Sequence, residues 1–212
     1  MRLGDAGSKR ARLGILGGSF NPVHLGHLLA AQSALERFDL SRVLFVPCNR
    51  PPHKDSWALA DFGRRYAMLE LALEDDLRCE VSDVERQRGG VSYSIDTVRR
   101  LRELHPSADL HFIIGSDTLS ELHQWKEIYD LLNLCTFVTL CRPGRQEYEV
   151  DAGRIALKEP WPEKLLAHCD HGRLIEVSSS DIRYRIAEGL SIRYLVPSAV
   201  EMYIAEHGLY LG

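Results

Sequence analysis

Short runs of apolar residues alternate along this chain with segments whose apolar residues recur every three or four positions. The runs predict buried β-strands, which we place at residues 13–16, 42–46, 79–81, 110–114, 135–140 and 173–177. The segments with helical spacing predict helices over residues 25–35, 61–74, 94–105, 178–188 and 197–207. Because strands and helices alternate, we expect an α/β fold with a doubly wound parallel sheet, which the last helices complete as a single domain.

Two parts of the chain depart from this alternation. Residues 146–172 are polar and irregular, and we expect a variable excursion there with one short helix around residues 164–167. Residues 1–11 precede the first predicted strand and contain no apolar stretch. We therefore expect residues 1–11 to form a flexible N-terminal extension and residues 12–212 to form the domain.

The first strand, turn and helix read LGILGGSFNPVHLGH over residues 13–27. Gly17 and Gly18 leave no Cβ at the turn to obstruct a ligand, and the helix that follows begins with unpaired N–H groups and the positive end of its dipole. His24 and His27 are three residues apart, so both imidazoles lie on one helix face beside the same anion position. Together these features predict a phosphate site, although each alone is also ordinary turn or surface chemistry. The glycines do not fit GxGxxG, which argues against a hydride-transfer Rossmann enzyme, and no GxxxxGK[ST] motif is present.

Polar residues also follow other predicted strands, where the carboxyl edge of a parallel sheet binds ligands. His53 and Lys54 lie in a proline-rich loop, and a phosphate-facing role is favoured over a solvated turn. The serines 178–180 are expected to cap a helix that carries Arg183 in its first turns. The same free N–H groups would suit phosphates.

Three further positions have both a structural and a functional interpretation. Ser94 is expected to cap the helix that begins near SYSIDT, and the N–H groups there could also bind substrate. Asp117 follows a strand and either accepts from ribose hydroxyls or caps the next helix. Trp125 lies in a helix-like stretch with Ile128, where a tryptophan usually belongs to the core.

At these residues the chain resembles a known family. The segment GGSFNPVHLGH resembles the signature of the nucleotidyltransferase superfamily with the HxGH motif, and within it the bacterial nicotinate-nucleotide adenylyltransferases. The resemblance covers nearly the whole chain from Arg12 onward. Its further motifs are PPHK at 51–54, SYSIDT at 92–97, GSD at 115–117, Trp125, RPG at 142–144 and SSSDIR at 178–183.

The resemblance implies a Rossmann-like nucleotidyltransferase fold and a reaction in which ATP and nicotinate mononucleotide give deamido-NAD and pyrophosphate. It implies catalytic roles for His24, His27 and Arg183. The implied ATP-binding residues are Gly17, Gly18, Ser19, Phe20, Gly115, Asp117, Ser179 and Ser180. The implied mononucleotide-binding residues are His53, Lys54, Tyr93, Ser94 and Trp125. A Mg²⁺ ion would be held mainly by the ATP phosphates and water, and no metal-binding residues are assigned.

Composition excludes several other classes. Apolar residues make up 45% of the 212 residues and the formal net charge is −4, so neither a basic face for nucleic acid nor a membrane-spanning segment is expected. A cytoplasmic location follows as the default, and a homo-oligomer stays open. The five cysteines are odd in number and lack a CxxC pair, so we expect reduced thiols rather than a disulfide framework or a zinc site.

Three other functions compete with this interpretation. Pantetheine-phosphate adenylyltransferases share the HxGH element, but Trp125 and SYSIDT argue against them. A fragment of a class I aminoacyl-tRNA synthetase would bind ATP through a related motif, but the chain has no basic face. A non-catalytic nucleotide sensor would not need Arg183 together with both histidines.

Overall fold

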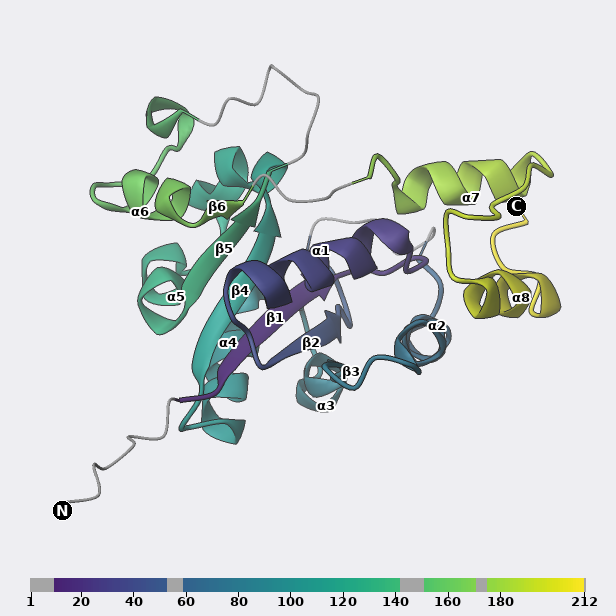
Figure 1. Cartoon of the computed structure of the whole chain (residues 1–212), viewed down its shortest axis with the longest axis horizontal. Helices are drawn as coiled ribbons and strands as arrows, with labels where there is room; N and C mark the ends of the chain where they lie inside the picture. The colour runs from purple at the N-terminus through teal and green to yellow at the C-terminus, as the bar shows by residue number, and fades with distance from the viewer. Residues whose placement is uncertain (1–9, 53–58, 142–150, 171–174, 212) are drawn as a thin grey trace, which may run out of the picture.

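The computed structural model describes residues 10–52, 59–141, 151–170 and 175–211, and its centre is one sheet of six parallel strands (Figure 1). The strand order is β3-β2-β1-β4-β5-β6. The strands are β1 (Arg12–Gly18), β2 (Arg42–Pro47), β3 (Cys79–Val81), β4 (Asp109–Gly115), β5 (Thr136–Leu140) and β6 (Cys169–Asp170). The order reverses at β1 and β4, and this is the point where open α/β sheets bind their ligands.

Helices cover both faces of the sheet, because the central strands are apolar on both sides. Leu13 and Ile15 of β1 belong to one core cluster, and Leu16 belongs to the other. The first cluster is covered by α3 (Val84–Arg88), α4 (Ser94–Leu104), α5 (Ile128–Leu134) and α6 (Trp161–Ala167). The second is covered by α1 (Leu25–Arg37), α2 (Phe62–Leu73), α7 (Ser179–Ala187) and α8 (Ser198–Glu206). The predicted doubly wound parallel fold is therefore confirmed.

The last helices pack beside the beginning of α1. Figure 1 shows α7 and α8 together next to α2 and to the N-terminal end of α1. Leu25 N–H, at the start of α1, donates to the Leu195 carbonyl over 3.0 Å, and Tyr210 Oη donates to Asn21 Oδ1 over 2.8 Å. The C-terminal segment therefore contacts the turn that links β1 to α1.

The prediction of a strand at residues 173–177 is wrong for the residues of this range that the structure describes. Residues 175–177 form no strand, residues 171–174 lie outside the described part, and the sixth strand is the two-residue β6. Thr139 and Leu140 of β5 pair with Cys169 and Asp170. The helix expected around residues 164–167 is present as α6, and a short 3₁₀-helix, η4 (Ala152–Arg154), precedes it.

The cysteine prediction is also wrong for one pair. Cys141 follows β5 directly and Cys169 begins β6, so the pairing of these strands brings the two Cα atoms to 6.4 Å, and the structure joins them in a disulfide. Cys48, Cys79 and Cys135 form no disulfide in the described part of the chain. Burial raises the pKa of the Cys135 thiol to about 12.

No helix in the described residues is long and apolar enough to cross a membrane. The flexible extension expected at residues 1–11 falls mainly on residues 1–9, which lie outside the described part.

Candidate active site

A cavity of about 550 Å³ lies at the carboxyl edge of the sheet, over the ends of β1 and β4. Most of the residues predicted for the site line it, although they come from five separate stretches of the chain. These residues are Gly17, Gly18, Ser19, His24, His27, Ser94, Gly115, Asp117, Trp125, Ser179, Ser180 and Arg183. The cavity does not include Phe20 or Tyr93, and His53 and Lys54 lie outside the described residues.

The two histidines stand at the beginning of α1 and face each other. His24 is the N-cap residue and is 6% exposed, and its ring stacks on that of His27 with 3.7 Å between the centroids. The backbone N–H of His24 donates to Nδ1 of His27 over 3.2 Å. Because Nδ1 of His27 accepts this bond, the neutral ring carries its proton on Nε2 and can donate it to an anion.

Gly26, between the two histidines, keeps this arrangement possible. A Cβ on Gly26 would lie 3.0 Å from the Cε1 and Nδ1 atoms of His24, closer than side chains normally approach. Gly26 was not among the residues predicted for the site, although its position inside the HxGH segment indicated it.

Phe20 supports His27 through a contact between their rings. Its side chain is 1% exposed and its ring meets that of His27 edge to face at 4.9 Å. Phe20, which does not line the cavity, thus acts on the site by packing against His27.

Helix α7 brings a cation and a helix N-terminus to the same turn. Ser178 is the N-cap, as predicted, and its Oγ accepts from the Asp181 N–H over 3.1 Å. Ser179 Oγ donates to the Pro22 carbonyl over 2.8 Å. Arg183 donates through Nη1 to the Asn21 carbonyl over 2.8 Å and through Nη2 to Ser180 Oγ over 3.2 Å. These bonds hold the guanidinium beside the histidine pair.

Arg65 of α2 fixes the turn from inside the protein. It is 1% exposed, and it donates to the carbonyls of Ser19, Cys48 and Ala60 over 2.8 to 2.9 Å. Burial lowers the pKa of this guanidinium below its ordinary value. Arg65 was not predicted from the sequence, where the only indication was a charged residue on the apolar face of its helix.

The end of β4 forms another wall of the cavity. Asp117 folds back so that a Cβ on Gly115 would overlap with its carboxylate. The 3₁₀-helix η2 (Ser116–Gln124) begins before Asp117, with Gly115 as its N-cap, so the interpretation of Asp117 as a helix cap is wrong. Its carboxylate lines the cavity.

The N-terminus of α4 faces the opposite side of the cavity. Ser94 is the first helical residue, so the expectation that it caps the helix is wrong: the extended residue at the N-cap is Tyr93, with φ −101° and ψ 132°. The Tyr93 carbonyl accepts from the N–H groups of Asp96 and Thr97. Within the described part of the chain, the N–H groups of Ser94 and Ile95 have no acceptor. They are free to bind an anionic group.

Trp125 lies between two helices and not within one. It ends η2 in an extended conformation, and its ring meets Phe112 edge to face at 5.9 Å. The expected continuous helix is interrupted by the extended Trp125, with ψ 138°, and by Glu127, which adopts a left-handed conformation with φ 51° before α5 begins. Trp125 thus lines the cavity and packs on the core at the same time.

Among the polar groups of the cavity, hydrogen-bond donors predominate: the two imidazoles, Arg183, serine hydroxyls and helix N-termini. Its carboxylates are Asp117 and Glu85, and Glu85 accepts from Thr97 Oγ1 over 2.6 Å and from the Asn49 N–H over 3.2 Å. Among the described residues, no three His, Cys, Asp or Glu side chains gather where they could hold a metal ion. Such a donor set suits phosphates and leaves the coordination of a divalent cation to phosphate oxygens and water.

Comparison with known proteins agrees with this geometry. The family model described as cytidylyltransferase-like matches residues 15–185. A probable nicotinate-nucleotide adenylyltransferase of Desulfitobacterium hafniense is 42% identical over 200 residues, covering 94% of this chain and 95% of that protein. A probable nicotinate-nucleotide adenylyltransferase of Geotalea uraniireducens is 43% identical over 211 residues, covering 94% of this chain and 98% of that protein.

A solved structure shares the fold at much lower identity. The nicotinic acid mononucleotide adenylyltransferase of Plasmodium falciparum, complexed with NaAD, superimposes with a TM-score of 0.71 and is 20% identical over 94% of this chain and 97% of that one. The relatives at more than 40% identity cover nearly the full length. The chain therefore belongs to the nicotinate-nucleotide adenylyltransferase family of nucleotidyltransferases.

Proposed function

We propose that this protein transfers the adenylyl group of ATP to nicotinate mononucleotide, which releases pyrophosphate and forms deamido-NAD. The observation that carries the proposal is the convergence of His24, His27 and Arg183 on one cavity at the end of β1. The name that the relatives share supports the choice of nucleotide.

The residues suit this reaction because it needs no side chain as a base. The attacking group is the 5′-phosphate of the mononucleotide, which is already an anion. The protein has to align this phosphate with the α-phosphorus of ATP and to stabilise charge as pyrophosphate leaves. In this proposal His27 Nε2–H and the Arg183 guanidinium donate to the phosphates, and Ser179 and Ser180 extend the anion site toward the β- and γ-phosphates, which the common cavity of these residues supports.

A divalent cation, Mg²⁺ in this proposal, would neutralise part of the triphosphate charge, and the phosphate oxygens and water would hold most of its coordination sites. The residues of the cavity would bind directly those phosphate oxygens whose charge the cation does not neutralise. Both substrates are small molecules, so the proposed reaction involves no nucleic acid, and we assign it to the cytoplasm, where ATP is supplied.

The two substrates would occupy opposite sides of the cavity. Gly17, Gly18 and Ser19 would meet the triphosphate, and Asp117 would accept from the ribose hydroxyls of adenosine beside Gly115. On the other side, Trp125 would stack on the pyridine ring while the N–H groups of Ser94 and Ile95, at the start of the helix that Tyr93 caps, meet its carboxylate. His53 and Lys54, which lie outside the described residues, remain proposed contacts to the mononucleotide, with no exact partner assigned.

A pyrophosphate-release assay tests the proposal. The purified protein is given ATP with nicotinate mononucleotide, nicotinamide mononucleotide or phosphopantetheine. We expect rapid release with nicotinate mononucleotide and very little with phosphopantetheine. Release with phosphopantetheine alone would assign the protein to the pantetheine branch, and ATP binding without release in any mixture would indicate a nucleotide sensor.

A further inference from the structure

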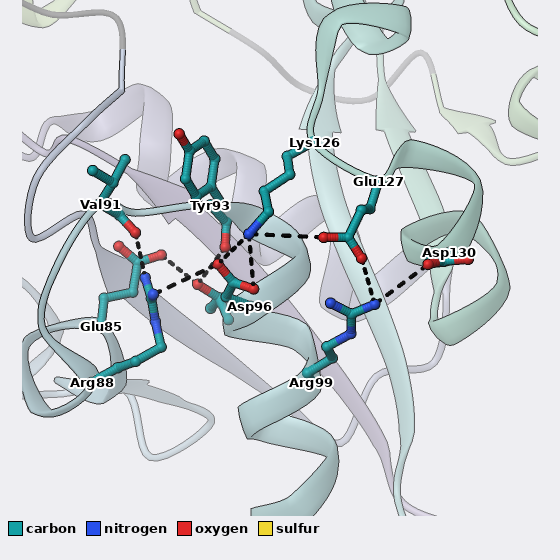
Figure 2. A network of polar contacts seen from close by, with 10 residues as sticks. Glu85, Arg88, Val91, Tyr93, Asp96, Arg99, Lys126, Glu127 and Asp130 are labelled. Atoms are coloured by element: carbon teal, nitrogen blue, oxygen red, sulfur yellow. Dashed lines mark hydrogen bonds and ion pairs between the residues drawn. The ribbon is translucent and has the colours of Figure 1, made fainter.

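A chain of ion pairs ties the segment that carries Trp125 to helix α4 (Figure 2). Asp96, in the first turn of α4, lies at its centre. Its Oδ2 atom is 3.2 Å from Lys126 Nζ and 3.7 Å from Arg88 Nη1. Asp96 is only 22% exposed at its side chain, so both cations meet it in a partly desolvated position.

The segment that carries Trp125 is bound to α4 a second time through Glu127, the residue after Lys126. Arg99 of α4 donates to Glu127 over 2.7 Å and also lies 3.4 Å from Asp130. Glu127 has the left-handed backbone conformation that ends the extended stretch containing Trp125. Non-glycine residues adopt it only where their surroundings hold them there.

Lys126 also connects this segment to Tyr93, the N-cap of α4. Its Nζ lies 4.7 Å from the centre of the Tyr93 ring, and in Figure 2 its side chain points toward both Tyr93 and Asp96. Arg88 donates to the Val91 carbonyl over 2.7 Å and also pairs with the Asp96 carboxylate. The guanidinium of Arg88 therefore links the loop before Tyr93 to Asp96. Tyr93, Ser94 and Trp125 are therefore joined through Asp96 and Lys126.

These ion pairs are partly exposed, and pairs of that kind contribute little to global stability. Their effect is local, because they fix a short irregular segment between two helices relative to the N-terminus of a third. The segment carries Trp125 and the helix carries Ser94, and both residues line the cavity. The placement of Trp125 relative to Ser94 decides how well a flat ring with an anionic substituent fits against both.

We propose that Asp96 and Lys126 are positioning residues that hold Trp125 against the N-terminus of α4 and thereby set the affinity for the mononucleotide. This inference rests on the proposed function, since it takes Trp125 and Ser94 as the contacts to the pyridine ring. Neither Asp96 nor Lys126 lines the cavity, so both act through the residues that they hold.

Steady-state kinetics of D96N, K126M and the double variant test the proposal. We expect each single substitution to raise KM for nicotinate mononucleotide about fivefold, as loss of one ordered aromatic contact would. KM for ATP and kcat at saturation should stay within about twofold. The double variant should be no worse than either single variant, because both remove the same link. E103Q is the matched control, since Glu103 pairs on the surface of α4 with Arg100 and with no other described residue.

The direction of the two effects separates positioning from a direct charge effect. If the residues acted as independent charges on an anionic substrate, D96N would lower KM while K126M raised it. Opposite signs, or additive effects in the double variant, would overturn the proposal.

A second measurement needs no substrate. In a W57F/W161F background Trp125 is the sole tryptophan, and its fluorescence quenching by acrylamide reports its exposure. D96N and K126M should increase the quenching constant at least about twofold, whereas E103Q should not change it. Unchanged quenching in both variants contradicts the positioning role.

W125A separates this inference from the proposed function. If W125A raises KM for the mononucleotide while D96N and K126M do not, only the positioning proposal fails. If W125A itself leaves KM unchanged, the assignment of the mononucleotide side fails, and with it the proposed consequence of the link.

Discussion

His24 shows how much of the proposed chemistry depends on single side chains. It is buried at the turn where charge would develop on the leaving pyrophosphate, stacked on His27. Replacing it with alanine should lower kcat by about 10² to 10³, as loss of an oxyanion donor does. Pyrophosphate release measures the effect, and circular dichroism checks the fold. The control is H123A, which removes an exposed histidine outside the cavity. A folded H24A variant with near-normal turnover would contradict the phosphate role.

Trp125 and Asp117 should separate the two substrates. W125A should raise KM for nicotinate mononucleotide more than KM for ATP, because aromatic stacking contributes about 0.5–1.5 kcal/mol beyond buried area. D117A should show the opposite bias, because its carboxylate lies at the end of β4 next to Gly115. Initial rates over a grid of both substrates give the two constants. Equal effects on both, or unfolding of W125A, would favour a core role for the tryptophan, which also contacts Phe112.

Residues in local motifs were predictable, and residues that act across distant segments were not. His24, His27 and Arg183 stand in short patterns whose chemistry can be interpreted in place, and the structure brings all three to one cavity. Arg65 donates to the carbonyls of Ser19, Cys48 and Ala60. These three carbonyls belong to loops that are separated along the sequence. Only the folded chain shows that these carbonyls point at one buried guanidinium.

At the scale of elements, length decided what the sequence could predict. The long buried strands β1, β2, β4 and β5 produce clear apolar runs, and all were predicted. Strand β6 has two residues, too few for any periodicity, and it forms because β5 offers an edge beside it. The break between η2 and α5 consists of the extended Trp125 and the left-handed Glu127, and no glycine or proline there indicates it in the sequence.

The N-terminus of α4 should discriminate the acid from the amide. Free N–H groups at Ser94 and Ile95 suit a carboxylate, whereas an amide would leave its NH₂ unpaired at a cost of about 1–3 kcal/mol. We expect kcat/KM for nicotinate mononucleotide to exceed that for nicotinamide mononucleotide at least tenfold. A ratio near one, or a preference for the amide, contradicts the deamido assignment.

Proline at Ser94 tests whether the backbone carries this preference. Ser94 is the first helical residue, where proline is tolerated, and the preceding Tyr93 is already extended as proline requires. S94P deletes one N–H without breaking α4 and should reduce the acid preference toward unity. S94A keeps that N–H and should retain most of the preference. If both variants change the ratio equally, the hydroxyl of Ser94 and not its backbone makes the contact.

At the scale of the whole molecule, the C-terminal part of the chain completes the site that its N-terminal part begins. Arg183 and Tyr210 both bond to Asn21, the first through the backbone carbonyl and the second through the side chain. The Asn21 side chain also accepts from the Ala60 N–H over 3.1 Å. Three segments thus hold the turn after β1 from different sides, which explains why a site of small motifs needs nearly the full length of the chain.

Tyr210 makes this long-range link testable through pH. Burial raises the pKa of its phenol above the ordinary value, whereas in the unfolded chain it ionises near pH 10. A raised folded pKa means that the stabilisation is complete below pH 10 and is lost as pH rises toward the folded pKa, because the unfolded state releases its proton first.

The variant Y210F removes both the ionisation and the bond to Asn21. We expect it to lower the free energy of unfolding by about 1 kcal/mol at neutral pH. Between pH 9 and 11 its stability should fall less steeply than that of the wild type, so the two curves converge. Urea unfolding across this range measures both effects, and the control is Y194F, which changes a tyrosine that is 79% exposed. If Y210F and the wild type lose stability in parallel, the Tyr210 phenol ionises equally in both states and does not hold the turn.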